Sequence, residues 1–500
     1  MTKAPPPVLV SLFVIACGGA DPSGAADPAA TSTGGASAEA AGPTVEALTA
    51  LAAEAWVYGY PAVYQRDEMF RATSTDELAF AAPLNLFGSA TRLARPEDRF
   101  VSVNNDTLYH MLQADVGDEP LVLNVPATGE RYLVLQFVDA WTNNFAYLGT
   151  RGSGGRAGRY LLAGPGWAGE VPEGVTLLRT PTRFFTVVGR VSVDGQGDVP
   201  AARRVQEQTW VTPLSLYPER PERDERAIGD RPVGAYDQEV PEELVFWDKL
   251  RVWMQLNPPP EAERAYVARF EPLGLLAVGP ESPYRNPRPE LRRALTAGRE
   301  VAEEALEERL TAGGNTTPHG WQFLLHLFDY NLDHFGVGTI DSDEWKIGDR
   351  QAAFQARAFA ARAGLWGNHG YEAAYAGILV DSEGRQLSGE HRYELTFPTP
   401  PPVDAFWSVT MYDHPNYWLV DNAIARYSIG DRTRGLRRGR DGSLTIHLGH
   451  EPPPDAPRSN WLPAPEGPFR PILRMYLPRA PILDRTWQLP PIRRVDDDAE

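Results

Sequence analysis

The sequence predicts a mainly β protein with helical insertions. Short β-branched and aromatic runs fill the stretch from Tyr393 to Trp487, and Pro, Gly, Asn or Asp interrupts each run. Similar runs occupy much of 100–216, whereas apolar residues recur at helical spacing between 242 and 363. The 46 prolines and 45 glycines suit a chain rich in loops. These observations are typical of antiparallel β-sandwiches linked by a helical region.

Length, charge and cysteine content limit the possibilities. A chain of 500 residues is too long for one core, so two or more domains are expected. It carries 48 basic and 66 acidic side chains, and the net charge of −18 argues against nucleic acid and anionic membrane surfaces as partners. Cys17 is the single cysteine, which excludes an intrachain disulfide framework and a cysteine-based zinc site.

The N-terminus has the pattern of a secretory signal. Lys3 precedes a short apolar run, and residues 1–16 are predicted to be a signal peptide. Val14-Ile-Ala-Cys17 resembles a bacterial lipoprotein box, so we expect Cys17 to be lipidated; the alternative is an ordinary signal peptide with an incidental cysteine. Gly18 in place of Asp then implies the outer membrane of the cell envelope. Residues 17–43, mostly Gly, Ala, Ser, Thr, Pro and Asp, are predicted to form a flexible, lipid-anchored tether.

The folded chain is predicted to begin with a helix. Thr44 is placed to cap a run of helical periodicity over 45–56, and Gly59-Tyr-Pro61 is expected to end that helix before a second one at 62–70. From residue 100 the pattern changes to strands, which we place at 121–125, 132–137, 160–162 and 184–188. The N-terminal helix and the first β domain therefore span 44–216.

A linker and a helical region are predicted over 217–370. Residues 218–232 mix both charge signs with prolines, which indicates a linker or an exposed loop. Helical periodicity returns in five segments, at 242–255, 261–269, 290–310, 323–334 and 349–363. Strands resume near Tyr375, and the second β domain is predicted to span 371–495.

A local pattern occurs once in each β region. A strand ends in Asp139 and is followed by Trp141, Asn143 and Asn144; another strand ends in Asp413 and is followed by Asn416, Tyr417 and Trp418. Either aspartate taken alone is explained by an Asx-turn, in which the side chain accepts from the backbone of the turn. The repetition predicts a duplicated β-sandwich whose loop edges present Asp, Asn and aromatic residues, and loop edges commonly bind ligands.

Longer motifs identify the chain as similar to a known family. In the C-terminal half they are Phe406-Trp-Ser-Val-Thr-Met-Tyr-Asp413, Arg426-Tyr-Ser-Ile-Gly-Asp-Arg-Thr433, Asn460-Trp-Leu-Pro-Ala-Pro-Glu-Gly-Pro-Phe469 and Leu473-Arg-Met-Tyr476; in the N-terminal half they are Asn105-Asp-Thr-Leu-Tyr109, Val125-Pro-Ala-Thr-Gly-Glu-Arg-Tyr132, Gly164-Pro-Gly-Trp167 and Thr212-Pro-Leu-Ser215. They resemble the bacterial family that pairs domains of unknown function 1254 and 1214. The resemblance implies two jelly-roll-like β domains with helical material between them, and it implies no reaction.

The richest polar group of the sequence lies in the first β domain. Asp106 and Asp139 are the candidate catalytic residues, because two carboxyl groups that lie close together act as an acid–base pair. The candidate ligand-binding residues supply amide, phenol, indole and guanidinium groups, and they are Asn105, Tyr109, Trp141, Asn143 and Arg151. The structural alternative is that Asn105 and Asp106 cap a turn and that Tyr109 only packs.

Other site types fit less well, and the sequence predicts no cofactor and no metal site. Gly152-Ser-Gly-Gly-Arg-Ala157 matches a dinucleotide fingerprint, but a strand follows where that motif requires a helix. Two histidine groups, His447 with His450 and His326 with Asp329, Asp333 and His334, are more typical of polar surface than of metal ligands. The arginine-rich segment 432–440 is predicted to be a solvated loop, or else a contact for anionic envelope polymers.

Two classes of function remain open. One is a hydrolase-like envelope enzyme that acts on a small polar or carbohydrate-like substrate near Asp106 and Asp139. The other is a non-catalytic protein that binds a glycan or another ligand, or that assembles through capsid-like jelly-roll surfaces. In both, the only contact with a membrane is the N-terminal lipid anchor.

Overall fold

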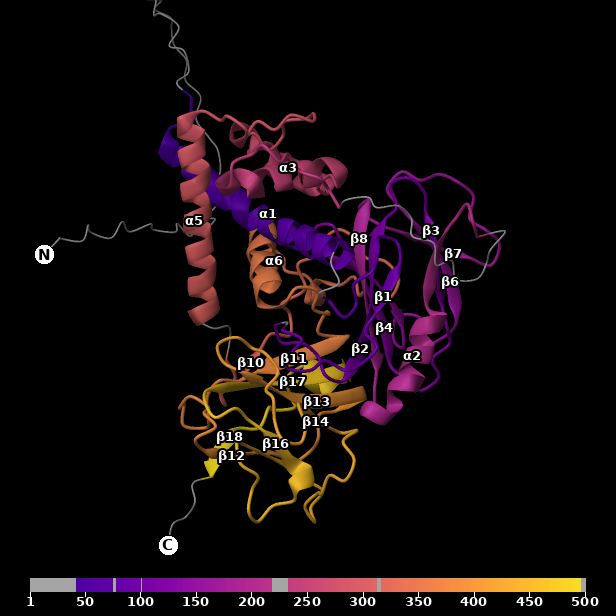
Figure 1. Cartoon of the computed structure of the whole chain (residues 1–500), viewed down its shortest axis with the longest axis vertical. Helices are drawn as coiled ribbons and strands as arrows, with labels where there is room; N and C mark the ends of the chain where they lie inside the picture. The colour runs from indigo at the N-terminus through magenta and orange to yellow at the C-terminus, as the bar shows by residue number, and fades with distance from the viewer. Residues whose placement is uncertain (1–41, 75–77, 100, 218–232, 313–315, 496–500) are drawn as a thin grey trace, which may run out of the picture. The chain divides into compact units, whose positions relative to one another are not determined.

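The computed structural model describes residues 42–74, 78–99, 101–217, 233–312 and 316–495 (Figure 1). Cys17, the signal peptide, nearly all of the tether and the 218–232 linker lie outside these residues. From Pro43 onward the chain forms one compact unit. Within the described residues, no helix is long and apolar enough to cross a membrane.

The first nine strands form a five-stranded and a four-stranded sheet. Their bounds are β1 Phe87–Ser89, β2 Thr107–Asp115, β3 Leu121–Val125, β4 Leu133–Asp139, β5 Asn144–Gly149, β6 Gly158–Ala163, β7 Thr176–Arg179, β8 Phe184–Ser192 and β9 Trp210–Pro213. The strand orders are β1-β2-β8-β4-β5 and β7-β6-β3-β9. Alternate side chains of the two sheets share one apolar core, to which Leu112 and Leu135 contribute from one sheet and Leu123 from the other.

The remaining nine strands form a second pair of sheets. Their bounds are β10 Gln322–Phe323, β11 Ala373–Gly377, β12 Arg392–Phe397, β13 Val403–Asp413, β14 Ser428–Gly430, β15 Leu444–Gly449, β16 Trp461–Pro463, β17 Phe469–Pro478 and β18 Ile492–Val495. The strand orders are β10-β11-β17-β13-β14 and β16-β15-β12-β18. Leu395 and Val409 belong to the core that fills this sandwich.

The two sandwiches have the same topology. Adding nine to each strand number of the first pair of sheets reproduces the strand orders of the second pair. The parallel pairing of β6 with β7 recurs as that of β15 with β16. The mainly β class and the duplicated sandwich are therefore confirmed. The jelly-roll topology implied by the resemblance is not confirmed.

Helices cover one part of the molecule and share a separate core. α1, Val45–Ser74, packs against α3, Val245–Leu256, α5, Pro289–Ala312, and α6, Arg350–Gly364 (Figure 1). The shorter helices are α2 Val199–Gln208, α4 Arg264–Ala268 and α7 Ala480–Leu483, and six 3₁₀ turns are Gln196–Asp198, Glu242–Leu244, Glu261–Glu263, Glu271–Leu273, Asp343–Trp345 and Arg458–Asn460.

Two helix predictions were wrong. Gly59 and Pro61 do not end α1, because both are buried in the packing of α1, and the side chain of Leu250 in α3 lies directly against Gly59. The predicted helix at 323–334 is instead the short strand β10 followed by turns. The side chain of Asn331 there accepts from the backbone N–H groups of Asp333 and His334, a local bonding pattern that competes with a helix.

Candidate functional site

A cross-strand pair of polar residues recurs on equivalent strands of the two sandwiches. Tyr109 on β2 lies opposite Arg190 on β8, and Tyr375 on β11 lies opposite Arg474 on β17. In the first sandwich, the neighbours Leu108 and Leu112 point into the core, so Tyr109 lies on the outer face of its five-stranded sheet. The duplication therefore places one Tyr–Arg pair on each five-stranded sheet.

The strand registers also place carboxylates and arginines at equivalent positions in the two sandwiches. Asp106 precedes Tyr109 by the same number of positions as Glu372 precedes Tyr375. Gly149 and Gly430 occupy equivalent positions on β5 and β14, and an arginine, Arg151 or Arg432, follows each of them two residues later. Each sandwich thus supplies one carboxylate, one tyrosine and two arginines to the region between them.

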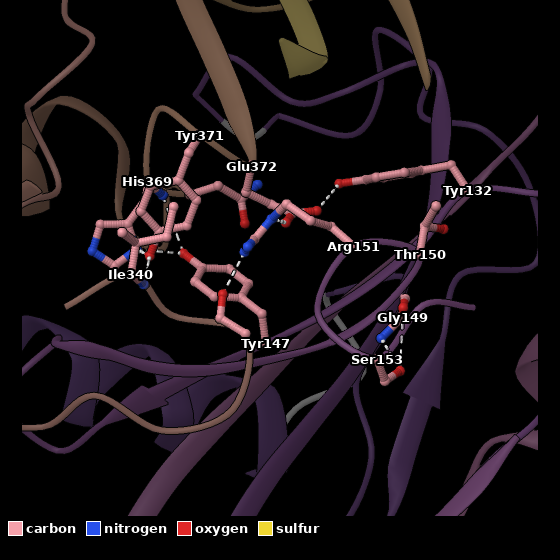
Figure 2. A network of polar contacts seen from close by, with 12 residues as sticks. Tyr132, Tyr147, Gly149, Thr150, Arg151, Ser153, Ile340, His369, Tyr371 and Glu372 are labelled. Atoms are coloured by element: carbon pink, nitrogen blue, oxygen red, sulfur yellow. Dashed lines mark hydrogen bonds and ion pairs between the residues drawn. The ribbon is translucent and has the colours of Figure 1, made fainter. Parts of the chain in front are cut away.

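At the Glu372 end these groups neutralise one another (Figure 2). The carboxylate of Glu372 accepts from the hydroxyl of Tyr132 at 2.8 Å and from Nε of Arg151 at 2.6 Å. The Arg151 guanidinium also donates to the carbonyl of Gly338 at 2.6 Å and lies 4.6 Å from the ring centroid of Tyr371. The side chain of Glu372 is only 1% exposed, so this end is a closed ion pair that joins the two sandwiches.

A buried histidine adjoins that ion pair (Figure 2). The Nδ1 atom of His369 lies 3.0 Å from the hydroxyls of both Tyr147 and Tyr371. Burial, assisted by the charge of Arg151, lowers the pKa of His369 to about 3. The imidazole is therefore neutral, and its Nδ1 is hydrogen-bonded to the phenols.

At the Asp106 end the equivalent groups are not paired with each other. The Asp106 carboxylate accepts from Oγ of Ser408 and, at 3.1 Å, from Oγ of Ser428, both in the second sandwich. The Arg432 guanidinium instead pairs with Asp194 at 2.9 Å and donates to the backbone carbonyl of Asp106 at 3.3 Å. The side-chain hydrogen bonds that this carboxylate accepts thus come from hydroxyl groups and not from a guanidinium.

A cleft of about 650 Å³ opens above Asp106. Asn105, Ser408, Ser428 and Arg432 also line it, and we call it the Asp106 cleft. Four exposed charged residues also line it, and they are Arg95, Glu97, Asp194 and Arg434. Three of the sequence motifs, 105–109, 406–413 and 426–433, contribute residues to this cleft although they lie far apart in the chain.

Asp139 lies far from this cleft. β2 and β4 are both antiparallel to β8, so they run in the same direction; Asp106 precedes β2 and Asp139 ends β4. Asp106 bonds to Val193 and Asp139 lies opposite Phe185, which corresponds to roughly 26 Å along β8 at the usual rise per residue. The prediction that these carboxyl groups share one pocket was wrong.

The groups around Asp139 are occupied in structural bonds. Its carboxylate accepts from the backbone N–H groups of Trp141 at 2.9 Å and Asn143 at 2.8 Å, and from Nδ2 of Asn143 at 3.1 Å. Burial raises the pKa of Asp139. The Trp141 indole donates to the carbonyl of Asn257 at 3.2 Å, away from the cleft. Asp413 accepts from the N–H of Trp418 at 2.7 Å, a bond that spans five residues, so both aspartates bond to the loop that follows but the Asx-turn of Asp139 is not repeated.

The other predicted residues divide between the two ends. Asn105 lines the Asp106 cleft, and its amide donates to the carbonyl of Ala94 at 2.6 Å. Tyr109 is half-buried on the outer face of β2, and Arg151 belongs to the closed Glu372 end. In the 432–440 segment, Arg432 is half-buried in the cleft whereas Arg434, Arg437, Arg438 and Arg440 are exposed.

Sequence reasoning missed Ser408, Ser428, Glu372, Arg190 and Arg474. A signal for the last was present, because Arg474 interrupts the apolar strand 469–478 with a charge that must face something polar. No comparable signal marks the two serines, which look like ordinary strand residues until Asp106 is placed above them.

The alternative site types have little support in the described part of the chain. No group of three or more His, Cys, Asp or Glu residues there is arranged to hold a metal ion. His326 bonds to Asp329 at 2.7 Å, and His447 lies 3.4 Å from Glu394. A second groove of about 690 Å³, lined by Phe145, Leu178 and 333–337 among others, contains none of the predicted site residues.

Comparison with known proteins gives a family and a fold. Two models, each described as a protein of unknown function, match the chain: DUF1254 at 84–213 and DUF1214 at 372–480. Comparison with curated proteins finds no match. The crystal structure of the VPA0106 protein from Vibrio parahaemolyticus is similar, with 24% identity, a TM-score of 0.64 and coverage of 90% of this chain and 100% of that one. An uncharacterized protein from Burkholderia cenocepacia has 14% identity, a TM-score of 0.43 and 89% coverage of each chain, which is too distant to carry an argument.

Proposed function

Because this chain belongs to the bacterial family that pairs DUF1254 with DUF1214, and both matched regions line one cleft, we propose that the Asp106 cleft binds a small polar ligand rich in hydroxyl groups. Asp106 lies within the first matched region, and Ser408, Ser428 and Arg432 lie within the second. The paired domains thus act as two walls of one binding site.

The difference between the two halves of the duplication carries this proposal. At the Glu372 end, carboxylate and guanidinium form a 2.6 Å ion pair, and neither residue lines the Asp106 cleft or the groove of Phe145 and Leu178. At the Asp106 end, the equivalent groups are held apart by other partners and border an open cleft. A buried charge is costly unless it is bonded, so a carboxylate left with hydroxyl donors alone is best explained by a ligand that adds donors.

The chemistry of the cleft suits a carbohydrate-like ligand. Asp106 offers a charged acceptor, Ser428 and Asn105 offer neutral polar groups, and Arg432 offers donors. Cyclic polyols need acceptors and donors that alternate over a short distance, as these do. The Arg432 guanidinium lies 3.6 Å from the ring centroid of Phe406, which holds it in one orientation.

Binding is favoured over hydrolysis. Glycoside hydrolysis requires a second carboxylate within about 5 to 10 Å of the first, and Asp139 is not near Asp106. The nearer carboxylates have other surroundings: Asp194 is paired with Arg432, Asp431 accepts from the backbone N–H of Trp407 at 3.2 Å, and Glu97 is exposed. The proposal is therefore a non-catalytic ligand-binding protein, and the capsid-like assembly alternative has no specific observation in its favour.

A screen of neutral and acidic mono- and disaccharides by thermal shift, followed by isothermal titration calorimetry, tests this function. The Asp106→Asn variant is expected to bind the hits about tenfold or more weakly, because one charge-assisted hydrogen bond is lost. Asp139→Asn is the matched control. Asp139 is also a buried aspartate, but its carboxylate bonds to the backbone of its own turn. Equal weakening in both variants, or full affinity in Asp106→Asn, contradicts the proposal.

We also propose that the protein is held in the cell envelope by a lipid on Cys17. The support is the sequence pattern alone, since Cys17 lies outside the described residues. Cys17→Ser is expected to move the protein from the detergent phase to the aqueous phase, with mass spectrometry of the N-terminal peptide as the direct readout. An unmodified Cys17 in the membrane fraction would rule out this anchor.

A further inference from the structure

Arg190 is a buried cation whose hydrogen bonds go to neutral acceptors. Its guanidinium donates to Oε1 of Gln136 at 2.7 Å, to the carbonyl of Trp366 at 2.9 Å and to Oδ1 of Asn368 at 3.5 Å. The residue is 7% exposed. Burial lowers the pKa of Arg190, yet the phenols of Tyr375 and Tyr109 hold that pKa above its usual value, so the group stays charged.

Arg474, its equivalent in the second sandwich, has the same character. Its guanidinium donates to Oγ1 of Thr410 at 3.1 Å and to the carbonyl of Ser102 at 2.6 Å, and the residue is 5% exposed. Burial lowers the pKa of Arg474, but the phenols of Tyr412 and Tyr476 raise it further, so this group also stays charged. Neither arginine has a carboxylate among its hydrogen-bond partners in the described chain.

The two arginines converge on shared phenols between the sandwiches. Tyr109 and Tyr476 both lie within electrostatic range of Arg190 and of Arg474. The centre of the Tyr109 ring is 5.8 Å from Cζ of Arg190, and Asn368, which accepts from Arg190, donates to the Tyr375 hydroxyl at 3.0 Å. We call Tyr109, Arg190, Tyr375 and Arg474 the Tyr–Arg cluster.

Charge in the Tyr–Arg cluster is not balanced. Asp106 lies within electrostatic range of Arg474, but its oxygens are already bonded to serines. Buried guanidinium groups are normally matched by carboxylate or phosphate, because neutral acceptors do not replace the lost hydration. A missing anion is the simplest account of two such groups that share the phenols of Tyr109 and Tyr476.

The two tyrosines of the cluster are partly accessible to a ligand. Tyr109 and Tyr375 are only half-buried although most of the residues around them on their strands are buried. Among the described residues, the Tyr109 hydroxyl has no hydrogen-bond partner. We propose that the Tyr–Arg cluster binds the oxyanion group of a small molecule, a carboxylate or a phosphate, between the two sandwiches, with the arginines and the phenols as donors.

This site is separate from the Asp106 cleft in its residues and in its chemistry. No member of the Tyr–Arg cluster lines that cleft, and Asp106 would repel an anion that the cluster attracts. The anion site therefore stands even if the Asp106 cleft binds nothing. Variants of the two sites distinguish them, because Asp106→Asn affects the cleft and leaves the cluster intact.

Calorimetry of the full chain with inorganic phosphate or acetate, against sodium chloride at the same ionic strength, tests the site. One of these anions is expected to bind saturably to the wild type, and Tyr109→Phe and Tyr375→Phe are each expected to weaken it about tenfold through the loss of one donor. These two variants keep their rings, so packing is preserved. Arg474→Lys, which keeps the charge and loses the planar fork, should weaken it as well.

Arg434→Gln is the control for nonspecific attraction, since it removes an exposed arginine outside the cluster. It should bind the anion as the wild type does, whereas Asp106→Asn should bind it at least as tightly, because a charge that repels the anion is removed. A response to phosphate alone assigns a phosphate ester, and a response to acetate alone assigns a carboxylic acid. The proposal is overturned by no binding above chloride, by unchanged affinity in both phenylalanine variants, or by equal weakening in Arg434→Gln.

Discussion

The Arg151→Met variant is expected to lose about 3 to 5 kcal/mol of stability. Removing the guanidinium leaves Glu372, whose side chain is 1% exposed, with the Tyr132 hydroxyl as its remaining partner. A buried carboxylate without a cation costs more than the pair itself contributes. Urea denaturation monitored by tryptophan fluorescence measures the loss, and Arg151→Met combined with Glu372→Gln should recover part of it because the uncompensated charge is gone.

The duplication provides a matched control for this prediction. Arg432 occupies the equivalent position in the second sandwich, but its partner Asp194 is 56% exposed. Exposed ion pairs contribute little, so Arg432→Met should cost about 1 kcal/mol. If both variants lose the same stability, the two ends of the interface do not differ as described here.

Acidification is expected to weaken the fold through His369. Its folded-state pKa of about 3 lies below the usual value of about 6.5. The stabilising contribution of the neutral imidazole is therefore complete above pH 6.5 and is lost as the pH falls toward 3. Between pH 7 and pH 4 this one group removes about 3 kcal/mol.

Comparison with His369→Gln isolates that contribution, because glutamine also offers an acceptor to Tyr147 and Tyr371 but does not titrate. The free energy of unfolding of each protein is measured at intervals from pH 7 to pH 4. The variant should be less stable at pH 7 and should show a shallower decline, since the carboxylates common to both proteins still titrate. Parallel curves would contradict a buried neutral histidine at this position.

Much of the fold could be predicted because local sequence patterns indicate its strands and turns. Asp139 and Asp413 each end an aromatic strand and accept from the backbone of the loop that follows, and that repetition led to the prediction of a duplicated sandwich. The errors arose where tertiary contacts outweigh local preference. α1 continues through Pro61 because the surrounding helices bury it, and 323–334 forms no helix because Asn331 bonds to the backbone there.

The candidate site was only partly predictable, for a reason of distance in sequence. Asp106, Asn105 and Arg151 were recognised as polar residues in need of partners, but the partner Ser408 lies 302 residues from Asp106 and Glu372 lies 221 residues from Arg151. Asp139 seemed to belong with Asp106 because both sit at strand ends. Only strand direction shows that these are opposite ends of the same sheet.

The two ends differ although the two sandwiches share one topology. The same carboxylate and arginine positions form a closed ion pair at Glu372 and an open cleft at Asp106. The ion pair joins the two sandwiches at one end, and a cleft lies at the other. The Tyr–Arg cluster between them retains the symmetry that both ends have lost.

A crystal structure of the full chain soaked with the tightest-binding saccharide from the screen tests the central claim most directly. The account predicts density for the sugar in the Asp106 cleft, with a ring hydroxyl within hydrogen-bond distance of the Asp106 carboxylate and another near Ser428 or Arg432. A sugar bound in the groove of Phe145 and Leu178, or at the Glu372 end, with the Asp106 cleft empty, would contradict it.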